Sequence, residues 1–158
     1  MKSYLVILLA FSTLFTLSCS SSDPSCREMN FRALDLSEFS GLEVVDDSTE
    51  DLFLVINSRN EFDEYIDLGT EEGTYFDIDF ETETLLIGKV RLIGIQGQLV
   101  EQRLEQCDDT VQFDLTVMNG GYHAIGKYYF GVVISKVNSS QVSFNVQTTK
   151  FDPWKGFY

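Results

Sequence analysis

Leu52-Phe53-Leu54-Val55-Ile56, followed directly by Asn57-Ser58-Arg59-Asn60-Glu61, is the stretch of sequence that decides the fold. The unbroken apolar run predicts a buried strand. Ser58 stands three residues before Glu61, which is the spacing of a capping box at the start of a helix. Apolar residues then recur at helical spacing as far as Gly69. The sequence therefore predicts a strand that leads into one short helix, packed on a sheet.

Beyond this unit the apolar residues recur at every second position, which is typical of strands. The segment 75–83 alternates acidic with apolar residues and predicts a strand with one wholly acidic face. Residues 85–93 predict a longer strand, in which Gly88 marks a bulge. Residues 99–107 fit both helical and strand spacing, and the strands around them favour a strand.

The last third of the chain predicts three strands in a meander. Residues 111–117 alternate as a half-buried strand does, and Asn119-Gly120-Gly121 supplies a tight turn. Two more strands are expected over 127–136 and 142–146. The predicted fold is mainly β, with a minor α+β character. We expect an antiparallel β-sandwich or curved sheet of about seven strands with one short helix, formed by residues 41–149.

The composition narrows the class of protein. Thirteen phenylalanines and seven tyrosines against two prolines favour an ordered, β-rich chain over a disordered one. The length fits one domain with a substantial core. A formal net charge of −14 argues against binding to nucleic acid or to anionic lipid head groups.

The start of the chain has the pattern of a secretory signal. The basic pair Met1-Lys2 precedes an apolar run over 4–15, which is near the lower limit for crossing a bilayer. Thr16-Leu17-Ser18-Cys19 then resembles the bacterial lipobox, as found in Bacteroidota-type lipoproteins, with Thr16 in place of the usual leucine. The resemblance implies cleavage after residue 18 and acylation of Cys19, which anchors the protein to the lipid membrane. An ordinary signal peptide with an incidental cysteine is the alternative.

The residues after Cys19 indicate where the anchored protein resides. Residues 19–40 have little periodicity and predict a lipidated tether. Ser20 directly after the cysteine, rather than an aspartate, agrees with release to the outer membrane in systems that use that rule. Only Asp23 supplies an acid just after the cysteine, which favours the periplasmic face over the cell surface.

Two cysteines remain when Cys19 is acylated, namely Cys26 and Cys107. In an oxidising compartment such a pair forms one disulfide. Two unrelated thiols are the alternative.

A family resemblance extends over residues 50–149. It is carried by the capped helix at Asn57-Ser58, by Ile78-Asp79-Phe80 leading into Leu85-Leu86-Ile87-Gly88, and by a strand over 128–136 followed by Val142-Ser143-Phe144. This order resembles the C-terminal domain of PrcB-like proteins, which are lipoprotein subunits associated with surface protease complexes. The resemblance implies a small β-rich accessory domain that assists a protein partner, and it implies no catalytic residue.

The chemically reactive side chains of the sequence point to no catalytic site. His123, the single histidine, follows a predicted turn, and Ser-His-Asp, Cys-His or zinc sites need more than it can supply. Carboxylates are plentiful over 46–51 and 77–83, and they make calcium the better metal candidate. Carboxylates two apart on one strand lie roughly 7 Å from each other, which favours a solvated acidic face instead. We therefore predict no catalytic residue, no metal and no cofactor.

The last stretch of the chain is unusually aromatic. Residues 150–158 form a tail that follows the last predicted strand and contains Phe151, Trp154, Phe157 and Tyr158. The tail either folds back and covers one end of the sheet, or it docks on a partner through its aromatic anchors. We assign these four residues as candidate partner-binding residues.

The function expected from these observations is that of a non-enzymatic accessory or interaction module, anchored in the outer membrane and assisting an envelope protein complex. The missing catalytic pattern, the resemblance and the aromatic tail all favour this hypothesis. The alternative is a lipoprotein that binds a small ligand, such as a glycan or calcium, on its acidic face.

Overall fold

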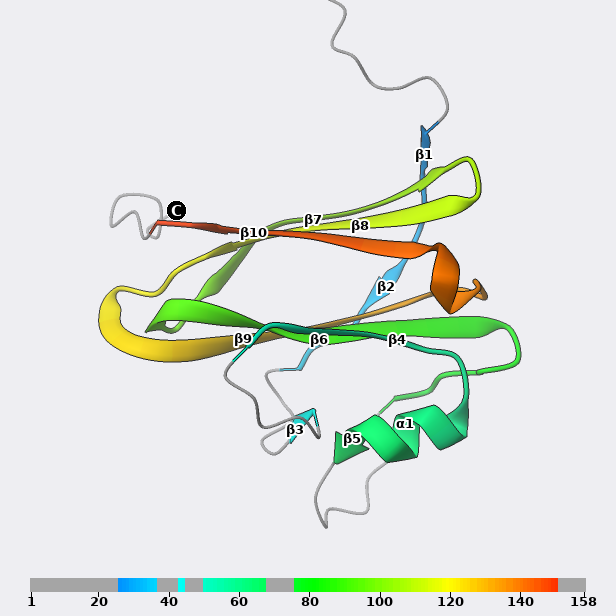
Figure 1. The fold of residues 1–158 in the computed structure, drawn as a ribbon, viewed down its shortest axis with the longest axis horizontal. Coiled ribbons are helices and arrows are strands. Elements are labelled where there is room, and N and C mark those ends of the chain that lie inside the picture. The colour runs from blue at the N-terminus through cyan, green and yellow to red at the C-terminus, as the bar shows by residue number, and fades with distance from the viewer. Residues whose placement is uncertain (1–25, 37–42, 45–49, 68–75, 151–158) are drawn as a thin grey trace, which may run out of the picture.

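The computed structural model describes residues 26–36, 43–44, 50–67 and 76–150. Over these residues the chain forms two four-stranded sheets that lie one above the other, and a short two-stranded pair (Figure 1). The first sheet has the order β1-β7-β8-β10, and the second has the order β2-β9-β6-β4. The elements are β1 (Cys26–Glu28), β2 (Arg32–Ala33), β3 (Glu43–Val44), β4 (Leu52–Ile56), α1 (Arg59–Tyr65), β5 (Ile66–Asp67), β6 (Glu83–Ile95), β7 (Gln98–Cys107), β8 (Thr110–Met118), β9 (Tyr122–Ser135), the 3-10 turn η1 (Ser139–Gln141) and β10 (Val142–Thr149).

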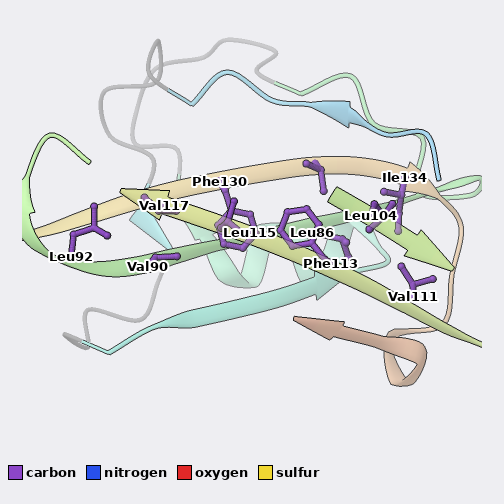
Figure 2. Close-up of a cluster of buried hydrophobic side chains, with 11 residues drawn as sticks. Leu86, Val90, Leu92, Leu104, Val111, Phe113, Leu115, Val117, Phe130 and Ile134 are labelled. Atoms are coloured by element: carbon purple, nitrogen blue, oxygen red, sulfur yellow. The ribbon is translucent and has the colours of Figure 1, made fainter. Parts of the chain in front are cut away.

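The predicted fold class is confirmed, because the chain is mainly β with one α-helix among the described residues. The main core lies between the two sheets and is formed by buried side chains of β6, β7, β8 and β9 (Figure 2). At its centre the rings of Phe113 and Phe130 stack with centroids 5.3 Å apart. The alternation predicted for the last strand also holds, since Val142, Phe144 and Val146 pack against this core.

A second core lies on the outer face of the second sheet, beneath α1. Phe62 of α1 is buried there against Leu85 and Ile87 of β6. The predicted capping box starts this helix: Ser58 Oγ accepts a hydrogen bond from the Glu61 amide at 3.2 Å. The Glu61 carboxylate in turn accepts from the amide of Asn57, at 2.6 Å.

The helix ends earlier than the sequence predicted. Ile66 has an extended backbone with φ of −119° and pairs with Val44, so α1 stops at Tyr65 rather than near Gly69. Ile66 is buried and β-branched, and β-branched side chains favour a strand over a helix. The helix therefore ends before it.

The predicted acidic strand over 75–83 is wrong. Residues 76–79 have no regular structure and residues 80–82 form a turn that leads into β6. Asp79 builds this turn, because its carboxylate accepts from the Glu81 amide at 3.0 Å and from the Thr82 hydroxyl at 2.9 Å. Such short side chains compete with a strand ladder by bonding to their own backbone. The apolar partners Ile78 and Phe80 nevertheless point inward, against the second core.

The predicted meander is also wrong, because consecutive strands change sheets. After β8 in the first sheet the chain crosses to β9 in the second, and it then returns to β10, which pairs with β8 in parallel. Asn119-Gly120-Gly121 is therefore a crossing between sheets and not a hairpin turn. Gly120 passes so close to the carbonyl of Ile95 that a Cβ atom would overlap it. The parallel pair is the one departure from the expected antiparallel arrangement among the described strands.

Gly88 does not mark a bulge. The irregularity in β6 lies between Ile93 and Ile95, where Gly94 has a positive φ of 117°. At Gly88 the reason for glycine is close packing instead, since a Cβ atom would collide with the carbonyl of Leu52 on β4. The ambiguous segment 99–107 is a strand, as predicted.

The folded domain begins within the stretch predicted as a tether. Cys26–Glu28 pairs with β7, and Arg32–Ala33 pairs with β9. The segment 26–36 therefore belongs to the sandwich, and it connects one sheet to the other. Its attachment depends on long-range pairing, which periodicity within a short segment does not reveal.

Candidate interaction surface

One side of the sandwich lies between β7 and β9, and we call it the open side. At this side β1 pairs with β7 only at residues 105–107, and β2 pairs with β9 only at 132–133. Both strands continue well beyond these short partners. Along 98–103 of β7 and 122–130 of β9, no described strand pairs with the outer edge.

The direction of the main chain at this side follows from two hydrogen bonds. The Leu104 carbonyl accepts from Met29 at 2.9 Å, and the Gly131 carbonyl accepts from Leu34 at 2.8 Å, so both carbonyls point to the outer edge. Because the pattern repeats every two residues along a regular strand, the amides of Gln102, Ile125 and Tyr129 also point outward. The open side therefore presents main-chain donors and acceptors from two strands.

A pocket of about 310 Å³ lies between the two edges. Segment 33–36 borders it on one side, and Leu99 and Gln102 of β7 border it on the other. Its wall from β9 is formed by residues 127–131, which include the half-buried ring of Tyr128. The pocket thus combines apolar and polar groups beside the main chain of two edge strands.

Tyr128 lines this pocket with a half-buried side chain. Burial raises the pKa of its phenol above the ordinary value of 10.0, and the negative charge of Asp35 raises that pKa further. The phenol is therefore neutral at physiological pH, and a neutral phenol is able to donate a hydrogen bond.

The opposite side of the sandwich, between β4 and β10, differs in its interior. There the ring of Phe53 stacks on Phe144 with centroids 5.3 Å apart, so aromatic side chains close the gap between the sheets. β6 extends beyond its partner β4 on this side, and two side chains cap its main chain. Asp51 accepts from the Arg91 amide at 2.7 Å, and Asn119 accepts from the Ile93 amide at 2.8 Å.

Large apolar side chains are exposed near the turn between β6 and β7. Leu99 and Val100 are 45% and 56% exposed, beside the open side. Ile93 and Ile125, which pair directly across β6 and β9, are 81% and 64% exposed. Large exposed apolar side chains of this kind are candidates for contact with another molecule.

The predicted site residues fall into two groups. Cys26 and Cys107 are joined by a disulfide, which fastens β1 to the end of β7. Cys19 and the four aromatic residues of the tail lie outside the described residues. His123, which was predicted to lie on or beside a turn, is the second residue of β9.

The calcium candidates of the sequence are only partly described, because Asp46 and Asp47 lie outside the described residues. Within the described residues, no three His, Cys, Asp or Glu side chains gather closely enough to hold a metal ion. Asp79, the centre of the predicted acidic face, accepts hydrogen bonds within its own turn.

Sequence reasoning missed the open side. The only local sign of it was the apolar pair Leu99-Val100 in a segment whose periodicity was ambiguous. The order of the strands determines which sheet edges stay unpaired. No single segment of the sequence reveals that order.

Among the described helices, none has the length and apolar character needed to cross a membrane. Comparisons with protein family models, with curated proteins and with solved structures gave no match.

Proposed function

We propose that this chain is a lipid-anchored, non-enzymatic accessory module of the outer membrane, which binds another envelope protein along the open side of its sandwich. The observation that carries the proposal is a pocket between two stretches of β7 and β9 whose outer edges pair with no described strand. β4 and β10 are edge strands too, but stacked phenylalanines fill the space between them.

The mode of binding that fits this surface is strand addition. An extended segment of a partner gains main-chain hydrogen bonds along a sheet edge, while alternate side chains enter pockets beside it. The outward amides of Ile125 and Tyr129 supply donors, and Leu99 supplies apolar contact at the pocket. Uncovered edges usually carry features that prevent such pairing, as Asp51 and Asn119 do at the far end of β6.

An anchor at Cys19 would fit this arrangement. The disulfide holds the start of the described chain at the Cys107 end of β7, whereas the uncovered stretch of β7 lies toward Gln98. If Cys19 is acylated, the chain from Cys19 to Cys26 spans at most about 25 Å. The anchored domain would then direct the uncovered stretch away from its attachment point.

The resemblance to PrcB-like domains supports the same class of function. Those proteins are lipoprotein subunits of surface protease complexes, so a protease or another member of such an assembly is the partner we expect. The small-ligand alternative keeps only one of its two motivations, the surplus of tyrosine and phenylalanine, because residues 76–82 do not form the acidic strand face.

Photo-crosslinking in the native envelope tests the proposal. A photoreactive residue at Leu99, in the pocket, should crosslink one defined protein, whereas the same group at the exposed Ser143 on β10 should not. Identical products from both positions, or none from Leu99, would contradict the proposal.

A pair of variants tests strand addition itself. Gln102→Pro removes an outward amide that no described strand uses, so it should abolish the crosslink from Leu99 while leaving the melting temperature nearly unchanged. Gln102→Thr keeps the amide and should preserve the crosslink. Equal crosslinking by the two variants would exclude main-chain pairing at this edge.

A further inference from the structure

The strand β10 has one uncovered edge along its whole length. It lies at the margin of the first sheet, and it pairs with β8 over all eight of its residues (Figure 1). No described strand pairs with its other edge. This edge is distinct from the open side, because it belongs to the opposite side of the sandwich.

The direction of the main chain along β10 follows from its last residue. The Thr149 carbonyl accepts from the Asn119 amide at 2.9 Å, and Asn119 directly follows β8, so this carbonyl points toward β8. The direction alternates from one residue to the next along a regular strand. Four residues therefore present both main-chain groups to the uncovered edge, and we call them the edge-facing residues: Val142, Phe144, Val146 and Thr148.

This edge carries none of the features that usually prevent strands from pairing. Although 23% of the residues in the chain are charged, none of the eight residues of β10 is. The strand contains no proline, and its pairing with β8 runs without a register shift. The uncovered stretches of the other two long strands do carry charges, at Glu101 and Arg103 on β7 and at Lys127 on β9. Native edge strands are usually protected by charges, proline or bulges.

The sequence of β10 is complementary to itself. Two identical antiparallel strands are related by a two-fold axis, and an axis at Asn145 is the one that pairs all four edge-facing residues with one another. Side chains that pack on the core then meet their own kind, and so do the exposed polar side chains. The resulting pairs are Phe144 with Val146, Val142 with Thr148, and Ser143 with Gln147. An aromatic residue opposite a β-branched one is a favourable cross-strand pair.

We propose that two copies of this chain pair through β10, antiparallel and about a two-fold axis at Asn145, so that their first sheets become one continuous sheet. The inference goes beyond the proposed function and does not depend on it, because it concerns another edge and a second copy of the same chain. A photoreactive group at Ser143 then captures only this second copy. Such a product is a homodimer, and its mass distinguishes it from a partner captured at Leu99.

The negative charge of the chain opposes the dimer at long range but not at the contact. Asn145 donates to Asp114 at 2.7 Å, and the two copies of Asp114 would lie three strand spacings apart, about 14 Å. Glu50 and Asp51 line a pocket with Thr148, and the two copies of Thr148 would lie about 20 Å apart. Both separations exceed the Debye length of about 8 Å at physiological ionic strength. Because each copy has a formal net charge of −14, added salt should strengthen the dimer.

A single cysteine on the axis tests the pairing. Asn145→Cys places two thiols opposite each other, with Cα atoms about 4.5 Å apart, which is within the range of a disulfide. Oxidation in the native envelope should then give a covalent dimer on a non-reducing gel. The unsubstituted protein, oxidised in parallel, shows any dimer that forms through its own cysteines. No dimer from Asn145→Cys above this background would overturn the proposal.

Two further cysteines test the register. Ser143→Cys alone, or Gln147→Cys alone, places the two thiols about 14 Å apart, so neither should form a dimer above background. The two variants expressed together should form one, because residue 143 of one copy lies opposite residue 147 of the other. If each single variant forms as much dimer as Asn145→Cys does, the copies meet without a fixed register, and the proposal is wrong.

A charge at the axis tests the dimer without added thiols. Asn145→Lys places two cations opposite each other, so it should weaken association severalfold. Within one chain the same cation lies near Asp114, so the fold should keep its stability. Asn145→Ser is the matched uncharged control and should still dimerise. Sedimentation of the full-length protein in detergent measures the association, which should tighten as NaCl rises from about 0.05 to 0.5 M. Equal association of the two variants, or a native protein that stays monomeric throughout, would contradict the proposal.

Discussion

The two sides of the sandwich differ in how the gap between the sheets is filled and in how the strand edges are bonded. At the β4–β10 side, Phe53 and Phe144 stack between the sheets, and Asp51 and Asn119 bond to the exposed amides of β6. At the open side, β1 and β2 cover only short parts of β7 and β9, and a pocket remains between them. The comparison teaches that a sheet edge becomes a candidate binding site when neither a strand nor a side chain satisfies it.

The disulfide limits the length of the open side, and removing it should have the largest effect. Cys26→Ser with Cys107→Ser releases β1 from β7 and opens a loop that spans a sequence separation of 81. We expect the free energy of unfolding to fall by about 2–5 kcal/mol. Urea unfolding measures this loss, and Ser25→Ala with the exposed Asp109→Ala, which leaves the disulfide intact, serves as control. A stability equal to that of the native protein would show that β1 contributes little to closing this side.

The β4–β10 side depends on close packing of β4 on β6 at Gly88. Gly88→Ala places a Cβ atom against the carbonyl of Leu52 and the ring of Phe130, so it should destabilise by about 1–3 kcal/mol. Gly131→Ala is the matched control, because its nearest contact is the flexible end of Leu34 at 3.2 Å. If thermal melts show equal losses for the two variants, β4 does not need this close approach.

The hydrogen bonds of Asn119 are a second feature that distinguishes the β4–β10 side from the open side. Asn119→Ala removes the acceptor for the Ile93 amide and a donor to the Thr149 carbonyl, and should cost about 1–2 kcal/mol. Asn145→Ala removes only an exposed bond to Asp114 on β8, so it should cost less than about 0.5 kcal/mol. A reversed order in chemical denaturation would refute the role given to Asn119.

The smallest effect is expected at the open side itself, from the titration of Tyr128. Its raised pKa means that the folded state holds the phenol proton more tightly than the unfolded chain does. The stabilising contribution is therefore complete below pH 10 and is lost as pH rises from 10 through the higher pKa of the folded state. Tyr128→Phe should lose less stability across this interval in urea titrations. Parallel losses in the two proteins would mean that Tyr128 is not perturbed.

Local patterns predicted the elements better than their arrangement. The capping box at Ser58 and Glu61 and the alternation over 111–117 gave a helix and a strand where the structure has them. Asp79 misled the prediction because its side chain bonds to its own turn, which alternation alone does not reveal.

The arrangement of strands could not be read from the sequence for a physical reason. The parallel pairing of β8 with β10 and the attachment of Cys26 to Cys107 join residues far apart in the chain. Such contacts form only when the whole core assembles. The open side results from that assembly, so it cannot be predicted from any single segment of the sequence.

Amide hydrogen exchange of the purified protein, measured residue by residue by NMR, tests the difference between the two sides most directly. The amides of Arg91 and Ile93 bond to Asp51 and Asn119, whereas those of Ile125 and Tyr129 point to the uncovered edge of β9. The account predicts slow exchange for the first pair and rapid exchange for the second. Equal protection of Ile125 and Tyr129 would contradict it, because the edge of β9 would then already be covered.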